Sequence, residues 1–238
     1  AVEKAGVARA GRPAIIADEG SRGYLQSPLE KIGATVVALG RDWNLSEEGE
    51  ELVLHWEDET YRWRSPPALS RGSCSAAILA LRHWFSAAAI RAQIRALEEL
   101  IIPGRCEVQP RDYGELVCDV AHNPAACARL SGFLKQSTNM RQWLVFGVQA
   151  DKDHAGMAEQ LAPLAEKFFL CNLPRPRGAT AEALSQLFPP AHTRRFASAR
   201  EALAAAENQA RELAQRASLP VRIIICGSFE TVAALGSG

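Results

Sequence analysis

Four short polar stretches stand out because each one follows an apolar run and carries side chains that can bind a charged substrate. They are Asp119 to Pro124, Asp151 to Asp153, Pro176 to Thr180, and Gly227-Ser228. The apolar runs before them have the length and composition of buried parallel strands. Because ligands of open α/β sheets bind beyond the carboxyl ends of the strands, we expect the four stretches to converge on one site.

The first stretch is the most unusual of the four. Asp119, at a strand end, can accept hydrogen bonds from ribose hydroxyl groups or hold the water shell of a cation, while His122 and Asn123 offer donors near the positive end of a helix. A nucleotide or another anionic ligand fits these groups. The alternative is that Asp119 and Asn123 only cap the helix that opens at Pro124. The pattern alone leaves both interpretations open.

The other polar positions carry weaker signals. Lys152 lies between two aspartates, which is more typical of a solvated, salt-bridged turn than of a ligand contact. Arg177 can bind phosphate or carboxylate, or simply precede a helix cap. Gly227 and Ser228 can present backbone amides to an anion or form a tight exit turn. Arg105 follows a Pro-Gly pair at an expected hinge, where a guanidinium could clamp phosphate groups.

The elements that must position these residues alternate between strand and helix in the second half of the chain. Strands are expected at 116–120, 143–148, 167–171 and 221–226, and helices at 124–135, 155–166, 181–187 and 199–216. Right-handed crossovers between such elements produce a mostly parallel sheet. This half therefore predicts a Rossmann-like domain.

The first half has a different rhythm. Strands at 13–17 and 34–39 flank a helical stretch at 27–32, a hairpin is expected from 52–56 and 60–63, and helices follow at 73–85 and 86–100. Pro103-Gly104 ends the last helix, and the pattern then restarts. We therefore expect an α/β protein with two domains, residues 1–102 and 103–238.

Composition excludes several classes of protein. The chain has 238 residues, of which 47% are hydrophobic, and its 27 basic and 27 acidic residues cancel, so no net charge favours nucleic acid or an anionic membrane. No apolar run approaches the roughly 18 residues of a membrane span. The six cysteines form no CxxC pair, which favours buried free thiols in a reducing cytoplasm. The chain opens without a methionine, and we expect it to be part of a longer protein.

Taken together, the motifs resemble those of folylpolyglutamate synthase and dihydrofolate synthase, which belong to the wider superfamily that includes the muramyl peptide ligases. The resemblance covers nearly the whole chain, and the Asp-Val-Ala-His-Asn-Pro stretch is its most specific part. The stretches that carry it are Glu3 to Val7, Pro103 to Arg105, Asp119 to Pro124, Asp151 to Asp153, Pro176 to Thr180, and Cys226 to Phe229.

The resemblance implies the end of a P-loop-type ATPase domain up to residue 102, followed by a glutamate-ligase domain. It implies that ATP phosphorylates a pterin-linked carboxylate and that the amino group of L-glutamate attacks the acyl phosphate, with Mg²⁺ neutralising the anions. The substrates would be dihydropteroate, folate glutamates or both. A cytoplasmic monomer is expected.

Residue roles follow from the same resemblance. Lys4 matches a lysine that becomes carbamylated and then binds magnesium. Arg105 and Asp119 match contacts to ATP phosphate and ribose. The residues expected to orient glutamate are His122, Asn123, Lys152 and Ser228, and His122 and Lys4 are the expected catalytic residues.

Three departures from the family pattern bear on function. No GK[ST] P-loop occurs in these residues, so we expect the chain alone to be inactive. Ser70 and Ser73 stand where the family places adenine-binding Gln and Asn, and Glu230 stands where relatives usually carry His or Tyr. Two alternatives therefore remain: a non-catalytic binding module derived from such a ligase, and a muramyl peptide ligase.

Overall fold

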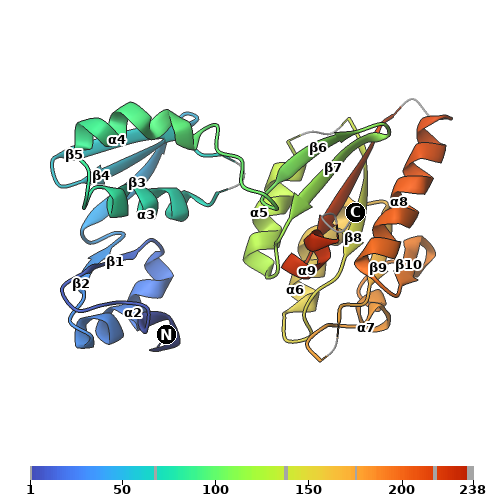
Figure 1. Cartoon of the computed structure of the whole chain (residues 1–238), viewed down its shortest axis with the longest axis horizontal. Helices are drawn as coiled ribbons and strands as arrows, with labels where there is room; N and C mark the ends of the chain where they lie inside the picture. Colours follow the sequence, from blue (N-terminus) through green and yellow to red (C-terminus); the bar gives the residue numbers. More distant parts are fainter. Residues whose placement is uncertain (1, 67–68, 137–138, 175, 217–218, 235–238) are drawn as a thin grey trace. The chain divides into compact units, whose positions relative to one another are not determined.

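The computed structural model describes residues 2–66, 69–136, 139–174, 176–216 and 219–234. The chain divides into two compact units, Ala1–Leu100 and Ile101–Gly238, called unit 1 and unit 2 below. Figure 1 shows helices and strands in both units, which confirms the predicted α/β class. The assignment of unit 1 to an ATPase domain stays a prediction.

Unit 1 contains a small parallel sheet and a separate antiparallel sheet. Strands β1 (Pro13–Ile16) and β2 (Thr35–Ala38) pair in parallel, and the connection between them contains α2 (Glu19–Lys31). The antiparallel sheet packs through Trp43, Leu54 and Trp63 against buried residues of the following helices. The other elements are α1 (Val2–Ala5), β3 (Trp43–Glu48), β4 (Glu51–Trp56), β5 (Glu59–Arg64), α3 (Arg71–Leu81), α4 (Ala87–Gln93) and the 3-10 helix η1 (Ile94–Leu97).

Unit 2 is built on a six-stranded sheet with the order β10-β9-β8-β11-β7-β6. All neighbouring strands are parallel except β6, which runs antiparallel to β7 at the edge. The prediction of a mostly parallel sheet is therefore confirmed. The strands are β6 (Glu107–Arg111), β7 (Gly114–Asp119), β8 (Arg141–Phe146), β9 (Lys167–Cys171), β10 (Thr193–Phe196) and β11 (Val221–Cys226).

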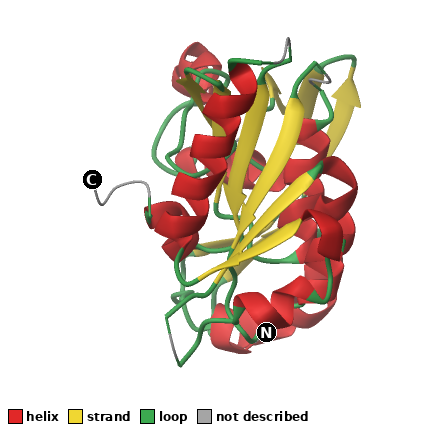
Figure 2. Cartoon of the chain, turned by 90° about the vertical axis from the view of Figure 1, so that its right-hand side faces the viewer, coloured by secondary structure: helices red, strands yellow, loops and turns green. Residues whose placement is uncertain are grey.

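Helices cover both faces of this sheet (Figure 2). On one face, Leu130, Met157 and Leu184 pack against strand residues such as Phe146, and on the other face the alanines of α8 pack against Ile223 and its neighbours. The helices are α5 (Pro124–Leu134), α6 (His154–Leu161), α7 (Ala181–Ser185), α8 (Ala199–Ala214) and α9 (Phe229–Ala233), with 3-10 turns η2 (Ala162–Leu164) and η3 (Pro190–His192).

The strand order places a topological switch point at β11. Strands β7 and β8 lie on either side of β11, and each continues into a helix on one face, α5 or α6. Strand β11 continues into α9, whose Val232 packs with the cluster on the opposite face. Connections that diverge to opposite faces leave a crevice at the carboxyl ends of the strands, which is the usual ligand site of such sheets.

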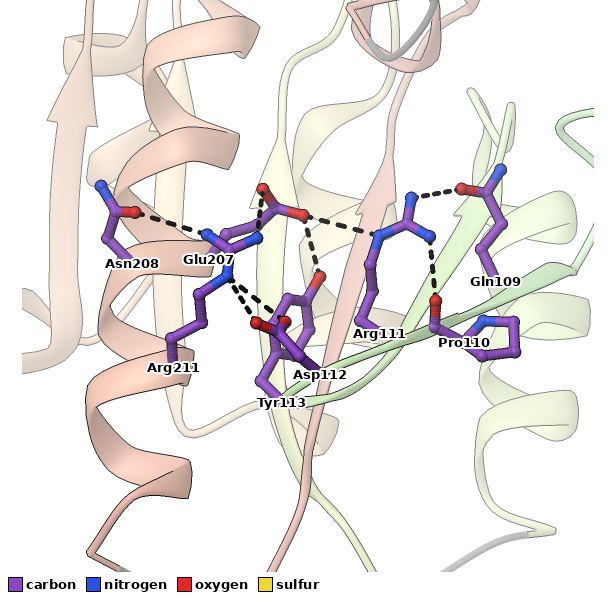
Figure 3. A network of polar contacts seen from close by, with 8 residues as sticks. All are labelled: Gln109, Pro110, Arg111, Asp112, Tyr113, Glu207, Asn208 and Arg211. Atoms are coloured by element: carbon purple, nitrogen blue, oxygen red, sulfur yellow. Dashed lines mark hydrogen bonds and ion pairs between the residues drawn. The ribbon is translucent and has the colours of Figure 1, made fainter.

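At the other end of the strands, away from their carboxyl ends, a polar network joins the β6–β7 turn to α8 (Figure 3). The Tyr113 hydroxyl donates to Glu207 Oε1 at 3.1 Å, and Arg211 Nε donates to Asp112 Oδ2 at 3.1 Å. Arg111 lies 3.7 Å from the same Glu207 oxygen. These groups satisfy one another's hydrogen-bonding capacity, so the network holds the β6–β7 turn against α8 at the amino-terminal end of β7.

Several predicted elements differ from the structure for identifiable reasons. The helix expected at 86–100 is wrong in extent, because α4 ends at Gln93 and a 3-10 helix follows. Strands β3, β6 and β10 were not predicted. All three are edge strands of polar sequence, and β6 contains Pro110, which only an edge strand tolerates. Helix α2 begins at Glu19, well before the expected start, because Asp18 caps it despite two early glycines.

Candidate functional site

Asp119 is fully buried at the carboxyl end of β7, and both of its oxygens already accept hydrogen bonds within the chain. Oδ1 accepts from the Ala121 amide at 2.7 Å. Oδ2 accepts from the Cys106 amide at 2.9 Å and from Cys106 Sγ at 3.3 Å. These bonds hold Cys106 at φ 44°, a left-handed conformation that is uncommon outside glycine. Asp119 therefore ties the end of β7 to the residues just before β6.

The positive charges of Arg105 and Arg129 influence the Cys106 thiol, and neither side chain has a side-chain partner among the described residues. Burial raises the pKa of the Cys106 thiol to about 12, Asp119 adds to the rise, and the charges of Arg129 and Arg105 oppose it. Nε and Nη2 of Arg129, on α5, are buried without an acceptor in the described part of the chain. Buried guanidinium nitrogens without an acceptor are costly, so this position is suited to an anionic group.

His122 has one ring nitrogen fixed and the other available. Nδ1 lies 2.9 Å from the Val120 carbonyl, and since a carbonyl only accepts, Nδ1 is the donor. Nε2 has no hydrogen-bond partner among the residues that the structure describes. The ring lies 6.3 Å from the Phe229 ring, so the loops after β7 and β11 meet here. In the neutral ring, Nε2 presents a lone pair at the carboxyl edge of the sheet.

Asn123 caps α5 in the way that the helix-capping interpretation requires. Its Oδ1 accepts from the Ala126 amide at 2.9 Å, and Pro124 occupies the first helical position. Asp119 makes no bond to this helix end. Capping therefore accounts for the Asn123 oxygen and not for Asp119, while the exposed amide nitrogen of Asn123 stays available for a ligand.

The loop after β8 is ordered by contacts with its own backbone and with the loop after β9. The Gln149 carbonyl accepts from His154 Nε2 at 2.9 Å, and the Ala150 amide donates to the Arg177 carbonyl at 2.7 Å. Lys152 Nζ donates to Asp151 Oδ2 at 3.0 Å, and this bond holds the pKa of the Asp151 carboxyl below its usual range. Lys152 thus forms the salt-bridged turn that the sequence favoured.

Ser228 is buried at the start of α9 and is linked to the loop after β8. Its Oγ accepts from the Thr231 amide at 3.0 Å and lies 2.8 Å from Thr231 Oγ1. Thr231 Oγ1 donates to the Gly147 carbonyl at 2.6 Å, so the Ser228 hydroxyl must be the donor to Thr231. Gly227 makes this approach possible, because a Cβ there would overlap the Gly147 carbonyl.

A second link joins the same two loops. Gln149 Nε2 donates to Glu230 Oε2 at 2.9 Å, between residues 81 positions apart in the sequence. This bond gives Glu230 a structural partner. Gln149 Oε1 is buried and has no donor among the described residues.

Lys4 lies in unit 1, on α1, with its side chain 78% exposed and paired with Glu3 at 3.3 Å. Within the part of the chain that the structure describes, no group of three or more His, Cys, Asp or Glu side chains is arranged to hold a metal ion. The described side chains therefore do not form a magnesium site by themselves. A carbamylated Lys4 would contribute one carboxylate to such a site.

The structure brings together most of the predicted positions of unit 2. His122 follows the carboxyl end of β7, Ser228 follows that of β11, and the loop carrying Lys152 follows that of β8. Arg105 is held at the same end of β7, because the neighbouring Cys106 amide donates to Asp119. Sequence reasoning missed Gln149 and Arg129. Arg129 could have been found as the one charged residue of an otherwise apolar helix, 124–134, whereas nothing in the sequence links Gln149 to Glu230.

A cavity of about 600 Å³ lies elsewhere, in unit 1 among α3, α4 and η1. Its walls are apolar side chains such as Leu81, Phe85 and Ile94, with Gln93 as a polar exception. Such walls offer no charge to orient an amino acid or a phosphate. The loops of unit 2 are therefore the better candidate for the site. Ser70 and Ser73, at the expected adenine position, form the cap of α3.

Comparison with known proteins gives a family match over this same unit. The glutamate ligase domain of the Mur ligases matches residues 104–229. The dihydrofolate synthase/folylpolyglutamate synthase of Escherichia coli K12 is 29% identical over 235 residues, which are 97% of this chain and 53% of that protein. The chain thus spans about half the length of the curated relative.

Solved structures give the same result. E. coli FolC in complex with DHPP and ADP has a TM-score of 0.79 and 29% identity, covering 99% of this chain and 55% of that one. The bifunctional folylpolyglutamate synthase/dihydrofolate synthase of Yersinia pestis, complexed with AMPPNP and a Mn ion, has a TM-score of 0.78 and 27% identity over 98% of this chain and 54% of that one. A further structure of such an enzyme holds Mn, AMPPNP and L-glutamate, with a TM-score of 0.79 and 28% identity over 98% of this chain and 55% of that one.

Proposed function

Because this chain belongs to the Mur ligase family through its glutamate ligase domain, we propose that it is part of an ATP-dependent ligase that adds L-glutamate to dihydropteroate, to folate glutamates, or to both. The observation that carries the proposal is the meeting of the loops after β7, β8 and β11 at the switch point of the sheet. The similarity to folylpolyglutamate and dihydrofolate synthases along almost the whole chain supports the choice of substrates.

The proposed reaction divides a difficult amide synthesis into two steps. The γ-phosphoryl group of ATP is transferred to a carboxylate oxygen of the pterin substrate, which gives an acyl phosphate and ADP. The amino nitrogen of glutamate then attacks the carbonyl carbon, the bond from carbon to the phosphate oxygen breaks, and the nitrogen loses a proton. Activation is required because a free carboxylate is a poor acceptor for an amine.

Within this reaction, the residues of unit 2 would bind and orient. His122 Nε2 would accept a hydrogen bond from the reacting amine, while the amide of Asn123 and the Lys152 ammonium would contact the carboxylates of glutamate. Arg105 and Arg129 would bind nucleotide phosphate. Ser228 would shape the pocket beside them.

For Asp119, the geometry favours a positioning role. The carboxyl group is fully buried and its oxygens accept from Cys106 and Ala121, so it would fix the backbone that carries Arg105. The contact to ribose stays a prediction, because it requires an oxygen that can face a ligand.

We further propose that residues 1–102 are the end of a central ATPase domain and residues 103–238 the glutamate-ligase domain of a cytoplasmic monomer. ATP and Mg²⁺ would be the cofactors, and relatives hold ADP, AMPPNP and Mn. Magnesium would neutralise phosphate charge, and of the described residues only a carbamylated Lys4 is assigned to it. No helix in the described ranges is long and apolar enough to span a membrane. The balanced charge gives no support for nucleic-acid binding.

The test is ADP formation by the protein expressed from its complete reading frame. We expect ADP formation to require both L-glutamate and a dihydropteroate or tetrahydrofolate acceptor. ADP formation with a uridine-diphosphate-muramyl acceptor instead would favour a muramyl peptide ligase. Binding of ligands without turnover would favour a binding module, the other alternative.

A further inference from the structure

The loops after β8 and β11 leave several hydrogen-bond acceptors without a donor among the described residues. Gln149 uses its amide nitrogen to donate to Glu230, and this bond fixes the amide orientation because a carboxylate cannot donate. Gln149 Oε1 then faces away, buried and without a donor in the described part of the chain. The second oxygen of Glu230 has no hydrogen-bond partner among the described residues, and the residue is exposed.

Ser228 also has hydrogen-bond acceptor capacity that the chain leaves unused. Its hydroxyl hydrogen is used on Thr231 Oγ1, whose own hydrogen goes to the Gly147 carbonyl at 2.6 Å. Ser228 Oγ accepts one bond, from the Thr231 amide at 3.0 Å, and retains one lone pair. Apart from the second hydrogen of the Gln149 amide nitrogen, the unused hydrogen-bonding capacity of Gln149, Ser228 and Glu230 is therefore that of acceptors.

A ligand with several N–H donors would satisfy the free oxygens of Gln149, Ser228 and Glu230, and the negative charge of Glu230 favours a cation. We propose that Glu230, positioned by Gln149, binds the ammonium group of the incoming amino acid when it first enters, before that group loses a proton and becomes the reacting amine that His122 contacts. The inference rests on the proposed function and deepens it, because it makes the site selective for an amino acid over a dicarboxylic acid of the same length. It also gives a role to a carboxylate at a position where an anionic substrate alone would be repelled.

The arrangement separates the two charges of the ligand. Glu230 lies on α9, at one end of the bond to Gln149, and Lys152 lies three residues further along the loop after β8. An ammonium at Glu230 and a carboxylate near Lys152 would match an α-amino acid in its zwitterionic form. Hydrogen bonds to charged groups are stronger than those between neutral groups, so loss of the Glu230 charge should be measurable in binding.

The test is binding of L-glutamate and glutarate to the 238-residue chain, measured by saturation-transfer NMR with competition. We expect L-glutamate to bind about tenfold more tightly than glutarate, the ratio that one charge-assisted hydrogen bond provides. Glu230→Gln should reduce this preference to about threefold or less without weakening the binding of glutarate. Glu182→Gln, which removes an exposed acid on α7 that pairs with Arg195, is the matched control and should leave the preference unchanged.

An unchanged preference in Glu230→Gln, or equal binding of glutarate and L-glutamate to the native chain, would overturn the inference. A wider panel of L-amino acids separates it from the proposed function. If L-glutamate fails to bind while another amino acid binds with the same dependence on Glu230, the ammonium site stands and the glutamate assignment is wrong. If no amino acid binds, the inference is overturned.

Discussion

Replacement of Asp119 by alanine tests the positioning role that the structure gives this residue. The substitution removes the acceptor for two buried backbone amides, those of Cys106 and Ala121. A buried donor left without an acceptor costs about 1–3 kcal/mol, and the left-handed conformation of Cys106 loses the bonds that hold it. Entry of water recovers part of this cost. We expect unit 2 to lose about 2–4 kcal/mol of unfolding free energy.

The assay must report on unit 2 alone, because two units need not unfold together. Amide hydrogen exchange at β8 and β11 gives the free energy of opening of the sheet core. Asn123→Ala is the matched control: it removes one helix-capping bond in the same loop and should cost about 1 kcal/mol. If Asp119→Ala is no more destabilising than this control, the account of Asp119 is wrong. Unchanged exchange together with weaker nucleotide binding would favour the ribose contact instead.

Four further predictions follow from the described contacts. Arg129→Met should weaken ADP binding while the free energy of unfolding stays equal or rises, because two buried guanidinium nitrogens without an acceptor are removed. A clear loss of stability on denaturant titration would contradict an anion site. His122→Ala in the full-length ligase should lower kcat far more than it lowers the unfolding midpoint, and normal kinetics would remove it from the site. Lys4→Ala in the same protein should abolish activity that short carboxylates partly restore, whereas full activity would make Lys4 a surface lysine. Burial raises the pKa of the Cys118 and Cys127 thiols from the ordinary 9.0 to about 12 in the folded protein. The unfolded chain therefore loses these protons first, and the free energy of unfolding, unaffected below about pH 9, should fall between about pH 9 and pH 12. A denaturation midpoint that stays constant across this range would contradict the burial of these thiols.

Much of the fold of unit 2 could be predicted because its central strands are continuous apolar runs. Strands β9 and β11 match their predicted bounds, and helix α5 is shorter by one residue. The ends of these elements are set by local sequence signals, such as the capping Asn123 followed by Pro124 at the start of α5. Edge strands lack those signals, since one side of each faces no partner and its sequence need not be apolar. The prediction of buried free cysteines is confirmed for all six.

The site could be predicted only in part, because sequence shows which loops converge but not how their side chains pair. The positions of His122 and Ser228 at the carboxyl ends of β7 and β11 could be predicted because each follows an apolar strand. The bond between Gln149 and Glu230 depends on two loops far apart in the chain, and no local pattern encodes it. The hydrogen bonds of Asp119 likewise depend on Cys106, which lies just before β6, an edge strand that the sequence did not predict.

The most direct measurement of the central claim is a map of ligand-induced amide shifts on the ¹⁵N-labelled chain, titrated with L-glutamate and with ADP. The account predicts that L-glutamate shifts amides of residues 121–123, 147–153 and 227–231, and that ADP shifts those around 104–106 and 129. Shifts confined to the amino edge of the sheet, at 111–114, or to unit 1 would contradict it.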